Sequence, residues 1–160
     1  MLAAKIAHEA DRQVSITLSD SFCVDRHRDS FRDLVHNHVD ILFANEAEIK
    51  SLYEVDTFDE ALIEVRRHCK VAALTRSEKG SVIVSGDSII EIAAEPVLKV
   101  VDTTGAGDLF ASGFLYGYTQ GYDLATCGRL GSICAAEIIS HMGARADADL
   151  KTLCAAAIPA

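Results

Sequence analysis

The sequence predicts an α/β fold with a mostly parallel sheet and an antiparallel hairpin at one edge. In the first half of the chain, apolar residues at helical spacing alternate with short apolar runs, as in chains that cross over between parallel strands. Two strand-like runs, 81–85 and 88–92, then flank Gly86-Asp87, a pair typical of a two-residue hairpin turn. These observations together favour parallel strands followed by an antiparallel edge.

The elements before the hairpin follow from the spacing of the apolar residues. In chain order, the expected elements are a helix over 2–10, a strand over 14–18, a helix around 31–38, a strand over 41–44, short helices around 49–53 and 61–65, and a strand over 71–74. The run 41–44 is bounded by polar residues and suits a strand covered on both faces. Because the chain starts on a helix that feeds a strand expected inside the sheet, we also expect one exposed sheet edge.

The elements after the hairpin centre on a glycine-rich turn at 105–107. We expect a short strand over 97–101 before it and a helix over 106–119 after it. A helix over 124–141 and a last helix containing Leu150 and Leu153 follow, with fraying over 155–160. No repeat, linker or break in composition divides the chain, so residues 1–160 are predicted to form a single domain.

Composition excludes several classes of function. Hydrophobic residues make up 49% and charged residues 24%, a balance typical of globular proteins. The formal net charge of −9 argues against non-specific binding to nucleic acid or anionic lipid. No apolar run reaches membrane-spanning length and the first residues carry charges, so we expect a soluble, cytoplasmic protein.

Cysteine and histidine spacing gives no sign of a disulfide framework or a zinc site. The five cysteines are widely separated and form no C-x-x-C pair, so we expect buried thiols. His36 and His38 are two residues apart and fall on different faces of a helix, which argues against a shared metal ion.

The turn at Gly105-Ala106-Gly107 is the most informative stretch, because small residues lead there directly into a helix. The first amides of a helix lack partners and carry partial positive charge, and glycines let an anion approach the main chain, so a phosphate can bind there. Asp108, in the first turn, could accept a proton from an attacking hydroxyl. The alternative is that Thr103 or Thr104 caps the helix and Asp108 complements its dipole. Phe110 stands where a dinucleotide fingerprint needs its third glycine, and no G-x-x-x-x-G-K-[ST] loop occurs.

The run from Asp102 to Asp108, followed by Phe110-Ala111-Ser112-Gly113-Phe114, resembles the C-terminal signature of the ribokinase-like carbohydrate and nucleoside kinases, of phosphofructokinase-B type. The resemblance implies a three-layer α/β/α fold. It also implies an anion hole formed by Thr104, Gly105, Ala106 and Gly107, with Asp108 as catalytic base. Asp102 and Thr104 match positions that help to hold a monovalent cation such as K⁺ in several members.

Other positions extend the resemblance. Asn45 and Glu48 match an Asn-x-x-Glu motif that organises Mg²⁺ and phosphate, although their spacing is also that of a helix capping box. Thr75, Ser77 and Gly80 fall where the family carries a Thr-x-Gly-x-x-Gly loop against ATP. Ser77 departs from that pattern, and an ordinary surface turn is the alternative.

Two further positions have both functional and structural interpretations. Gly143 and the alanine after it resemble the terminal Gly-Ala segment that lies beside the adenine pocket in the family. Gly143 is also the residue expected after a helix end. Residues 18–28 look most like the adenosine-kinase branch, in which Phe22 would stack on the nucleoside base. An aromatic residue at the end of a strand is otherwise typical of a core.

The resemblance runs from near residue 1 to about Leu153 but covers only the C-terminal portion of the family, so the N-terminal strands and the lid are expected to be missing. It implies ATP and Mg²⁺ as cofactors and a nucleoside, adenosine first, or a sugar as the phosphoryl acceptor. A nucleotide-binding domain without catalysis is the alternative, and a purely structural α/β domain is disfavoured by three motifs in family order. The oligomeric state is open, with a homo-oligomer among the options.

Overall fold

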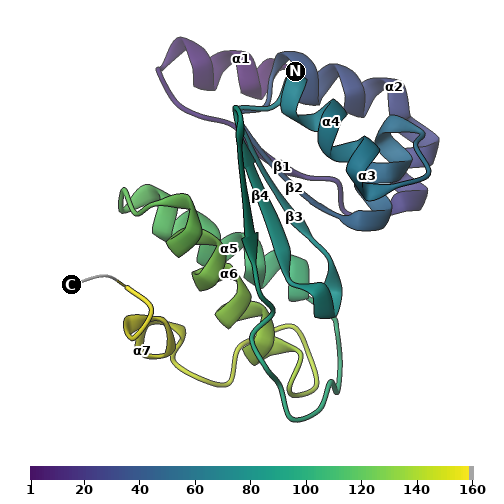
Figure 1. Cartoon of the computed structure of the whole chain (residues 1–160). Coiled ribbons are helices and arrows are strands. Elements are labelled where there is room, and N and C mark those ends of the chain that lie inside the picture. Colours follow the sequence, from purple (N-terminus) through teal and green to yellow (C-terminus); the bar gives the residue numbers. More distant parts are fainter. Residues whose placement is uncertain (159–160) are drawn as a thin grey trace. The chain divides into compact units, whose positions relative to one another are not determined.

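The computed structural model describes residues 1–158 and divides into two compact units. The first unit holds Met1–Thr75 and Ile83–Ile89, and the second holds Arg76–Val82 and the chain from Ile90 onward. Figure 1 labels their elements, and each unit is described by itself. Among the described residues, no helix is both long and apolar enough to cross a membrane. The predicted single domain over 1–160 stays a prediction.

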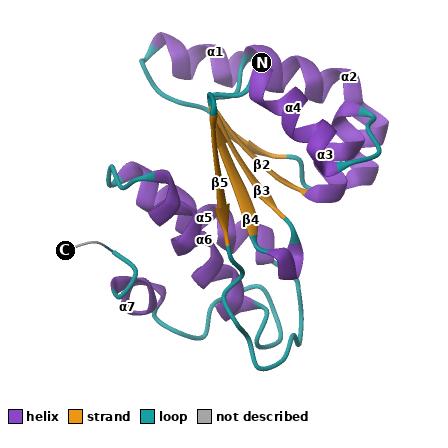
Figure 2. Cartoon of the chain, in the orientation of Figure 1, coloured by secondary structure: helices purple, strands orange, loops and turns teal. Residues whose placement is uncertain are grey.

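Helices and strands alternate through the first unit, as the periodicity predicts (Figure 2). Its elements are α1 (Leu2–Glu9), β1 (Ser15–Thr17), α2 (Ser21–Asn37), β2 (Ile41–Asn45), α3 (Glu46–Tyr53), α4 (Phe58–His68) and β3 (Val71–Thr75). Strand β2 pairs in parallel with β1 and with β3, in a register that places Asn45 opposite Thr75. The first four residues of β2 and of β3 are buried, as expected for strands covered on both faces.

The hairpin consists of β4 (Ser81–Ser85) and β5 (Ser88–Ile92), with Gly86 in the left-handed region at φ 55°. The sheet order is β1-β2-β3-β4-β5. Neighbouring strands joined by two residues must run antiparallel, because a parallel connection needs a crossover. The parallel strands with an antiparallel edge are therefore confirmed, and β1 is the opposite edge, with Ser15 and Thr17 exposed.

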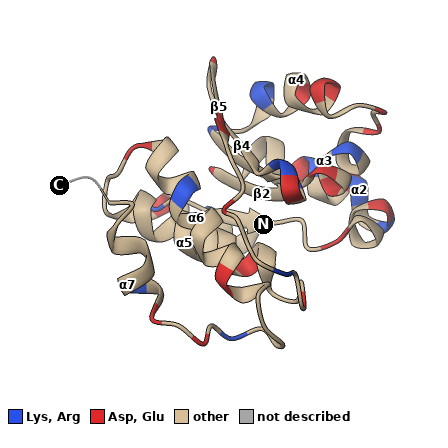
Figure 3. Ribbon diagram, turned by 60° about the horizontal axis from the view of Figure 1, so that its bottom comes forward, with Lys and Arg blue, Asp and Glu red and all other residues tan. Residues whose placement is uncertain are grey.

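The second unit contains the short 3₁₀ turn η1 (Ser77–Lys79) and the helices α5 (Ala106–Thr119), α6 (Leu124–Ile138) and α7 (Leu150–Ala155). Helices α5 and α6 approach closely through glycines. A Cβ atom on Gly113 would lie 2.5 Å from the Leu130 carbonyl oxygen, and one on Gly131 would lie 2.8 Å from that of Phe110. Leu130, Cys134 and Cys154 then form a core that joins α6 to α7. The ribbon in Figure 3, coloured by residue type, has few charged residues along α5 and α6, as this packing requires.

Two sequence-based expectations about elements are wrong. Residues 97–101 form no strand: Leu98 is fully exposed, while the Val101 amide donates to the Ile139 carbonyl oxygen at 2.8 Å. Helix α2 begins ten residues before the apolar stripe that predicted it, at Ser21, because the Asp20 side chain caps it by accepting a hydrogen bond from the Cys23 amide at 2.7 Å.

Smaller differences concern the thiols and the helix ends. Four cysteines are buried as predicted, whereas Cys23 is only partly buried. Helix α6 ends at Ile138 rather than at 141. The fraying predicted over 155–160 falls partly on residues 159–160, which lie outside the described residues.

Candidate functional site

The turn before α5 has the geometry of an anion-binding helix start. Gly105 is the N-cap residue at φ 82° and ψ 0°, a left-handed conformation that favours glycine, and no side chain caps the helix there. The Ala106 amide donates to Thr103 (3.2 Å) and the Leu109 amide to Gly105 (2.9 Å). Among the described residues, the amides of Gly107 and Asp108 between them have no hydrogen-bond partner. The helix therefore offers two unpaired donors at its positive end.

Gly107 and Asp108 are both exposed in the first turn of α5. A Cβ atom on Gly107 would meet nothing within 4 Å, so the main chain is open to a ligand. The Asp108 carboxylate accepts no hydrogen bond from the described residues, whereas its main-chain carbonyl accepts one from Ser112 Oγ at 2.8 Å. The carboxylate is thus free to accept a proton or a hydrogen bond.

Asp102 holds the turn in shape with both of its carboxylate oxygens. Its Oδ1 accepts hydrogen bonds from the Thr104 amide (2.9 Å) and the Thr104 hydroxyl (2.7 Å), and its Oδ2 accepts one from the Gly143 amide (3.0 Å). These bonds lower the pKa of Asp102 to about 2, the Thr104 hydroxyl contributing most. Thr104 therefore braces Asp102 within the turn.

Gly143 has φ 94°, the left-handed conformation expected after a helix end, although it lies beyond the end of α6. Its amide joins this segment to Asp102, and the next residue packs on the turn: a Cβ atom on Gly105 would lie 3.2 Å from the Ala144 Cβ. The structure thus brings Gly143 together with the turn at 102–108, as the sequence-based site requires.

Asn45 and Glu48 form a capping box at the start of α3 in the first unit. The Glu48 amide donates to Asn45 Oδ1 (2.8 Å), the Asn45 amide donates to Glu48 Oε2 (2.8 Å), and the Asn45 side-chain amide donates to Glu48 Oε1 (2.7 Å). Burial raises the pKa of Glu48, the Asn45 amide opposes this, and the nearby Asp20 carboxylate adds to it. The capping alternative is confirmed, and one free lone pair on each carboxylate oxygen still allows a water-mediated contact.

In the loop after β3, the backbone conformation accounts for two residues, Ser77 and Gly80. Thr75 ends β3 beside Asn45 at the carboxyl edge of the parallel strands, where ligands of α/β proteins usually bind. In the second unit, Ser77 has φ 53°, a conformation that glycine adopts at lower cost. Gly80 has φ 85°, and a Cβ atom there would lie 2.0 Å from the Ile92 carbonyl oxygen, so only glycine fits.

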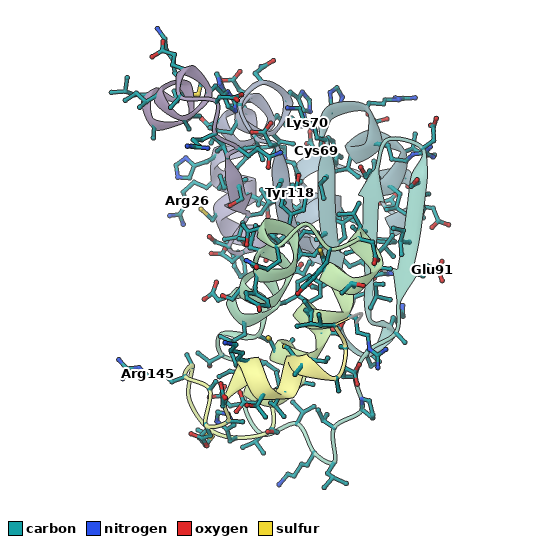
Figure 4. All side chains as sticks on the ribbon, turned by 90° about the vertical axis from the view of Figure 1, so that its left-hand side faces the viewer. Arg26, Cys69, Lys70, Glu91, Tyr118 and Arg145 are labelled. Atoms are coloured by element: carbon teal, nitrogen blue, oxygen red, sulfur yellow. The ribbon has the colours of Figure 1, made fainter. Side chains whose placement is uncertain are left out.

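Phe22 is the second residue of α2 and is 79% exposed, so it does not belong to the core. Its stacking on a base stays a prediction. Nearby, Arg26 projects away from the ribbon (Figure 4). Arg28 instead joins α2 to α3, donating to the Ser51 carbonyl oxygen (2.9 Å) and to Asp25 (2.6 Å).

Sequence reasoning gave no site role to three titratable residues around these sites. Asp20 follows β1 and influences Glu48, and its N-cap spacing to Cys23 is the signal that could have found it. Glu137 and His141 are four residues apart at the end of α6, with Glu137 Oε1 3.2 Å from His141 Nε2. Their i,i+4 spacing indicates only a side-chain pair, because the contacts that make Glu137 important come from main-chain amides further along the chain.

Comparison with known proteins identifies the family. Over 97% of this chain, a probable sugar kinase from Rhizobium etli CFN 42 has 51% identical residues and a TM-score of 0.94. Over 98%, the adenosine kinase from Sinorhizobium meliloti has 47% identity and a TM-score of 0.95; the match covers 48% of each of these proteins. A cytidine kinase from Thermococcus kodakarensis is 39% identical over 121 residues, 74% of this chain and 43% of the relative.

The chain thus spans less than half the length of these relatives. The sequence profile of the pfkB family carbohydrate kinases matches residues 1–151, and these carry both the capping box at Asn45 and the turn at Gly105. The chain therefore belongs to the pfkB family of carbohydrate kinases.

Proposed function

We propose that this chain carries the ATP-side apparatus of a kinase that phosphorylates a nucleoside hydroxyl, with Asp108 as the catalytic base. The observation that supports this most is the pairing of two unpartnered amides, at Gly107 and Asp108, with an exposed and unpaired carboxylate in the same helical turn. An anion and a proton acceptor are needed side by side when a hydroxyl attacks a phosphoryl group.

In the proposed reaction, the acceptor hydroxyl gives its proton to the Asp108 carboxylate while its oxygen bonds to the γ-phosphorus of ATP and the bond to ADP breaks. In the predicted anion hole at Gly105-Ala106-Gly107, the Ala106 amide already donates to Thr103, so the unpaired amides of Gly107 and Asp108 stabilise the charge on the transferred group. Asp102 and Thr104 hold the turn that presents them. Because phosphoryl transfer depends mainly on alignment and charge neutralisation, these groups address its main requirements.

The other predicted site residues take supporting roles in this proposal. Thr75, Ser77, Gly80 and Gly143 would contact the nucleotide, and Phe22, exposed on α2, would stack on the acceptor base. The oxygen atoms of Asn45 and Glu48 suit Mg²⁺, which would neutralise charge on the phosphates and would be held through water, since the capping bonds already occupy these side chains. Asp102 and Thr104 would help to hold a monovalent cation.

Two relatives named as nucleoside kinases, for adenosine and for cytidine, support a nucleoside acceptor, and adenosine is the first choice because that relative has the higher identity. A sugar is the second choice, supported by the similar probable sugar kinase. The alternative function is nucleotide binding without catalysis. The unpaired amides of Gly107 and Asp108 would serve it equally, because a bound phosphate needs no catalytic base.

The test is formation of AMP from adenosine and Mg·ATP by the purified chain, with Asp108→Asn as the control variant. We expect product from the unchanged chain and its loss in the variant, with ATP affinity within about three-fold, because a base acts in the transition state rather than in binding. Equal turnover by the variant would rule out Asp108 as the base.

A melting-temperature measurement with millimolar Mg·ATP separates the alternative function. A bound nucleotide stabilises the folded state by mass action, so nucleotide binding without turnover supports the non-catalytic function. Absence of both turnover and stabilisation would contradict both proposals.

A further inference from the structure

Residues 139–144, which follow α6, contact the turn before α5 and hold it in place. The Val101 amide donates to the Ile139 carbonyl oxygen at 2.8 Å, and the Gly143 amide donates to Asp102 Oδ2 at 3.0 Å. Ala144 packs against Gly105, where a Cβ atom would come within 3.2 Å of the Ala144 Cβ. The shape of the turn therefore depends on where residues 139–144 lie.

The segment between α6 and α7, residues 139–149, has no helix or strand to fix it. Its anchor is the Glu137 side chain, which is only 8% exposed. Glu137 Oε1 accepts hydrogen bonds from the Asp147 amide (2.8 Å) and the Ala148 amide (2.9 Å), and His141 Nε2 lies 3.2 Å away. One carboxylate oxygen thus contacts His141 near the start, and the amides of Asp147 and Ala148 near the end, of the segment that carries Gly143.

The hydrogen bonds to Glu137 favour its ionised form. Burial alone would raise its pKa, but the Ala148 and Asp147 amides and His141 outweigh burial and lower the pKa. His141 also lies 3.3 Å, through Nδ1, from the Met142 carbonyl oxygen, and its Nδ1 is 3.6 Å from Asp147. With acceptors beside both ring nitrogens, the protonated ring fits best, which gives Glu137 a charge-assisted partner.

We infer that Glu137 is a positioning residue for the phosphate-binding turn: it fixes residues 139–149, and these fix Asp102 and Gly105. The inference rests on the proposed function of the turn. Glu137 itself would touch neither nucleotide nor acceptor. Arg145, in the same segment, is exposed and projects away from the ribbon in Figure 4.

A purely structural role is the competing explanation, because Glu137 lies in the last turn of α6 and binds amides of the segment that leads to α7. Such a role would lower the stability of the whole unit without a special effect on the turn. A positioning role predicts loss of order at 101–109 at conditions where the fold is intact, together with a lower kcat and little change in KM.

The first experiment is amide hydrogen exchange of the native chain, comparing Glu137→Ala with Asp123→Ala. Asp123 caps the other end of α6 by accepting from the Thr126 amide at 2.9 Å, so its variant weakens the same helix away from the turn. We expect Glu137→Ala to speed exchange of the peptide containing Thr104 and Gly105 by about ten-fold or more, because exchange reports local opening.

The remaining arms of the exchange experiment test specificity. Asp123→Ala should leave that peptide unchanged. Glu137→Gln keeps an oxygen acceptor for the two amides and should restore part of the protection. Unchanged exchange in Glu137→Ala, or an equal increase in Asp123→Ala, overturns the inference.

Phosphoryl transfer supplies the second readout. Supporting residues that orient a functional group commonly contribute 10- to 100-fold, so Glu137→Ala should lower kcat by roughly that factor with KM for the nucleoside within about three-fold. Equal kcat in the variant overturns the inference. If the unchanged chain has no turnover, the proposed catalysis fails, and the exchange comparison still decides whether Glu137 positions the turn.

Discussion

Asp40 is a buried carboxylate whose ionisation should stabilise the first unit, and Asp40→Asn tests this. Its Oδ2 accepts hydrogen bonds from the Val14 amide (2.8 Å) and lies 2.9 Å from His8 Nε2, while Oδ1 accepts from Lys70 Nζ at 2.7 Å. The side chain is 6% exposed. It therefore connects α1, the start of β2 and the residue before β3, where Lys70 is labelled in Figure 4.

The magnitude follows from the pKa. Burial alone would raise the pKa of Asp40, but the hydrogen bonds from Lys70, Val14 and His8 outweigh burial and lower it from 3.8 to about 2. At 1.36 kcal/mol per pKa unit this fall corresponds to roughly 2.4 kcal/mol. Because the side chains of Lys70 and His8 are 74% and 40% exposed, solvent screening reduces this value, and we expect about 1–2 kcal/mol.

The sign of the pH dependence is fixed by a folded-state pKa that lies below the unfolded one. The stabilisation is fully present above pH 3.8 and is lost as the pH falls through about 2, with roughly half remaining at pH 3. Asp40→Asn should therefore lower the free energy of unfolding by about 1–2 kcal/mol at pH 7 and by roughly half as much at pH 3.

Urea unfolding followed by far-UV circular dichroism measures this difference, since the chain has no tryptophan. Asp87→Asn is the matched control, because Asp87 pairs with Arg66 at 3.0 Å but is fully exposed, so its loss should be much smaller. A loss in Asp40→Asn that is the same at pH 7 and pH 3 would refute the electrostatic explanation and leave only a change in packing.

Two further predictions concern backbone fit and thiol chemistry. Gly80→Ala should lower the free energy of unfolding in urea by about 2 kcal/mol or more, because φ is left-handed and the new Cβ atom would lie 2.0 Å from the Ile92 carbonyl oxygen. Gly86→Ala, at φ 55° with open space around it, should lower it by only about 1 kcal/mol. Equal losses would contradict the contact at Gly80. Cys134 and Cys154, with sulfurs 3.7 Å apart, should form a disulfide with the thiol oxidant diamide, which takes up their two hydrogens. Burial raises the pKa of Cys134 to about 12, so the oxidation should be slow and should accelerate in mild urea. Peptide mapping without reductant detects the disulfide. A disulfide that involves Cys127 instead would contradict the prediction.

Local patterns predicted most elements because each is stabilised by residues close in sequence. The hairpin at 81–92 is marked by Gly86-Asp87, and the capping box of α3 by Asn45 and Glu48. The onset of α2 was missed because only Val24 and Val35 of this helix are fully buried, too few to show helical spacing near its start. The strand expected over 97–101 failed because apolar spacing alone does not provide a pairing partner: the chain there follows Ile139 instead.

The candidate site, too, could be predicted from the sequence only where its residues are close together in the chain. The glycine turn and Asp108 are contiguous in sequence and could be recognised there. The bond from Gly143 to Asp102 joins residues 41 apart, and those from Asp147 and Ala148 to Glu137 join residues 10 and 11 apart. Main-chain amides donate these bonds, and an amide belongs to nearly every residue type, so no residue pattern announces them.

The distribution of amide donors also favours one carboxylate as the base. A base must offer a free lone pair to the incoming proton, and hydrogen bonds to the ionised form make a carboxylate a weaker base. Around the turn, Asp102 accepts from Thr104 and Gly143, and Glu137 accepts from Asp147 and Ala148; the pKa of each is lowered. Asp108 receives no such bond from the described residues while it adjoins the unpaired amides. In a chain of net charge −9, these donors thus stabilise the ionised form of the carboxylates that shape the turn, and Asp108 is left without such a donor and available to the acceptor hydroxyl.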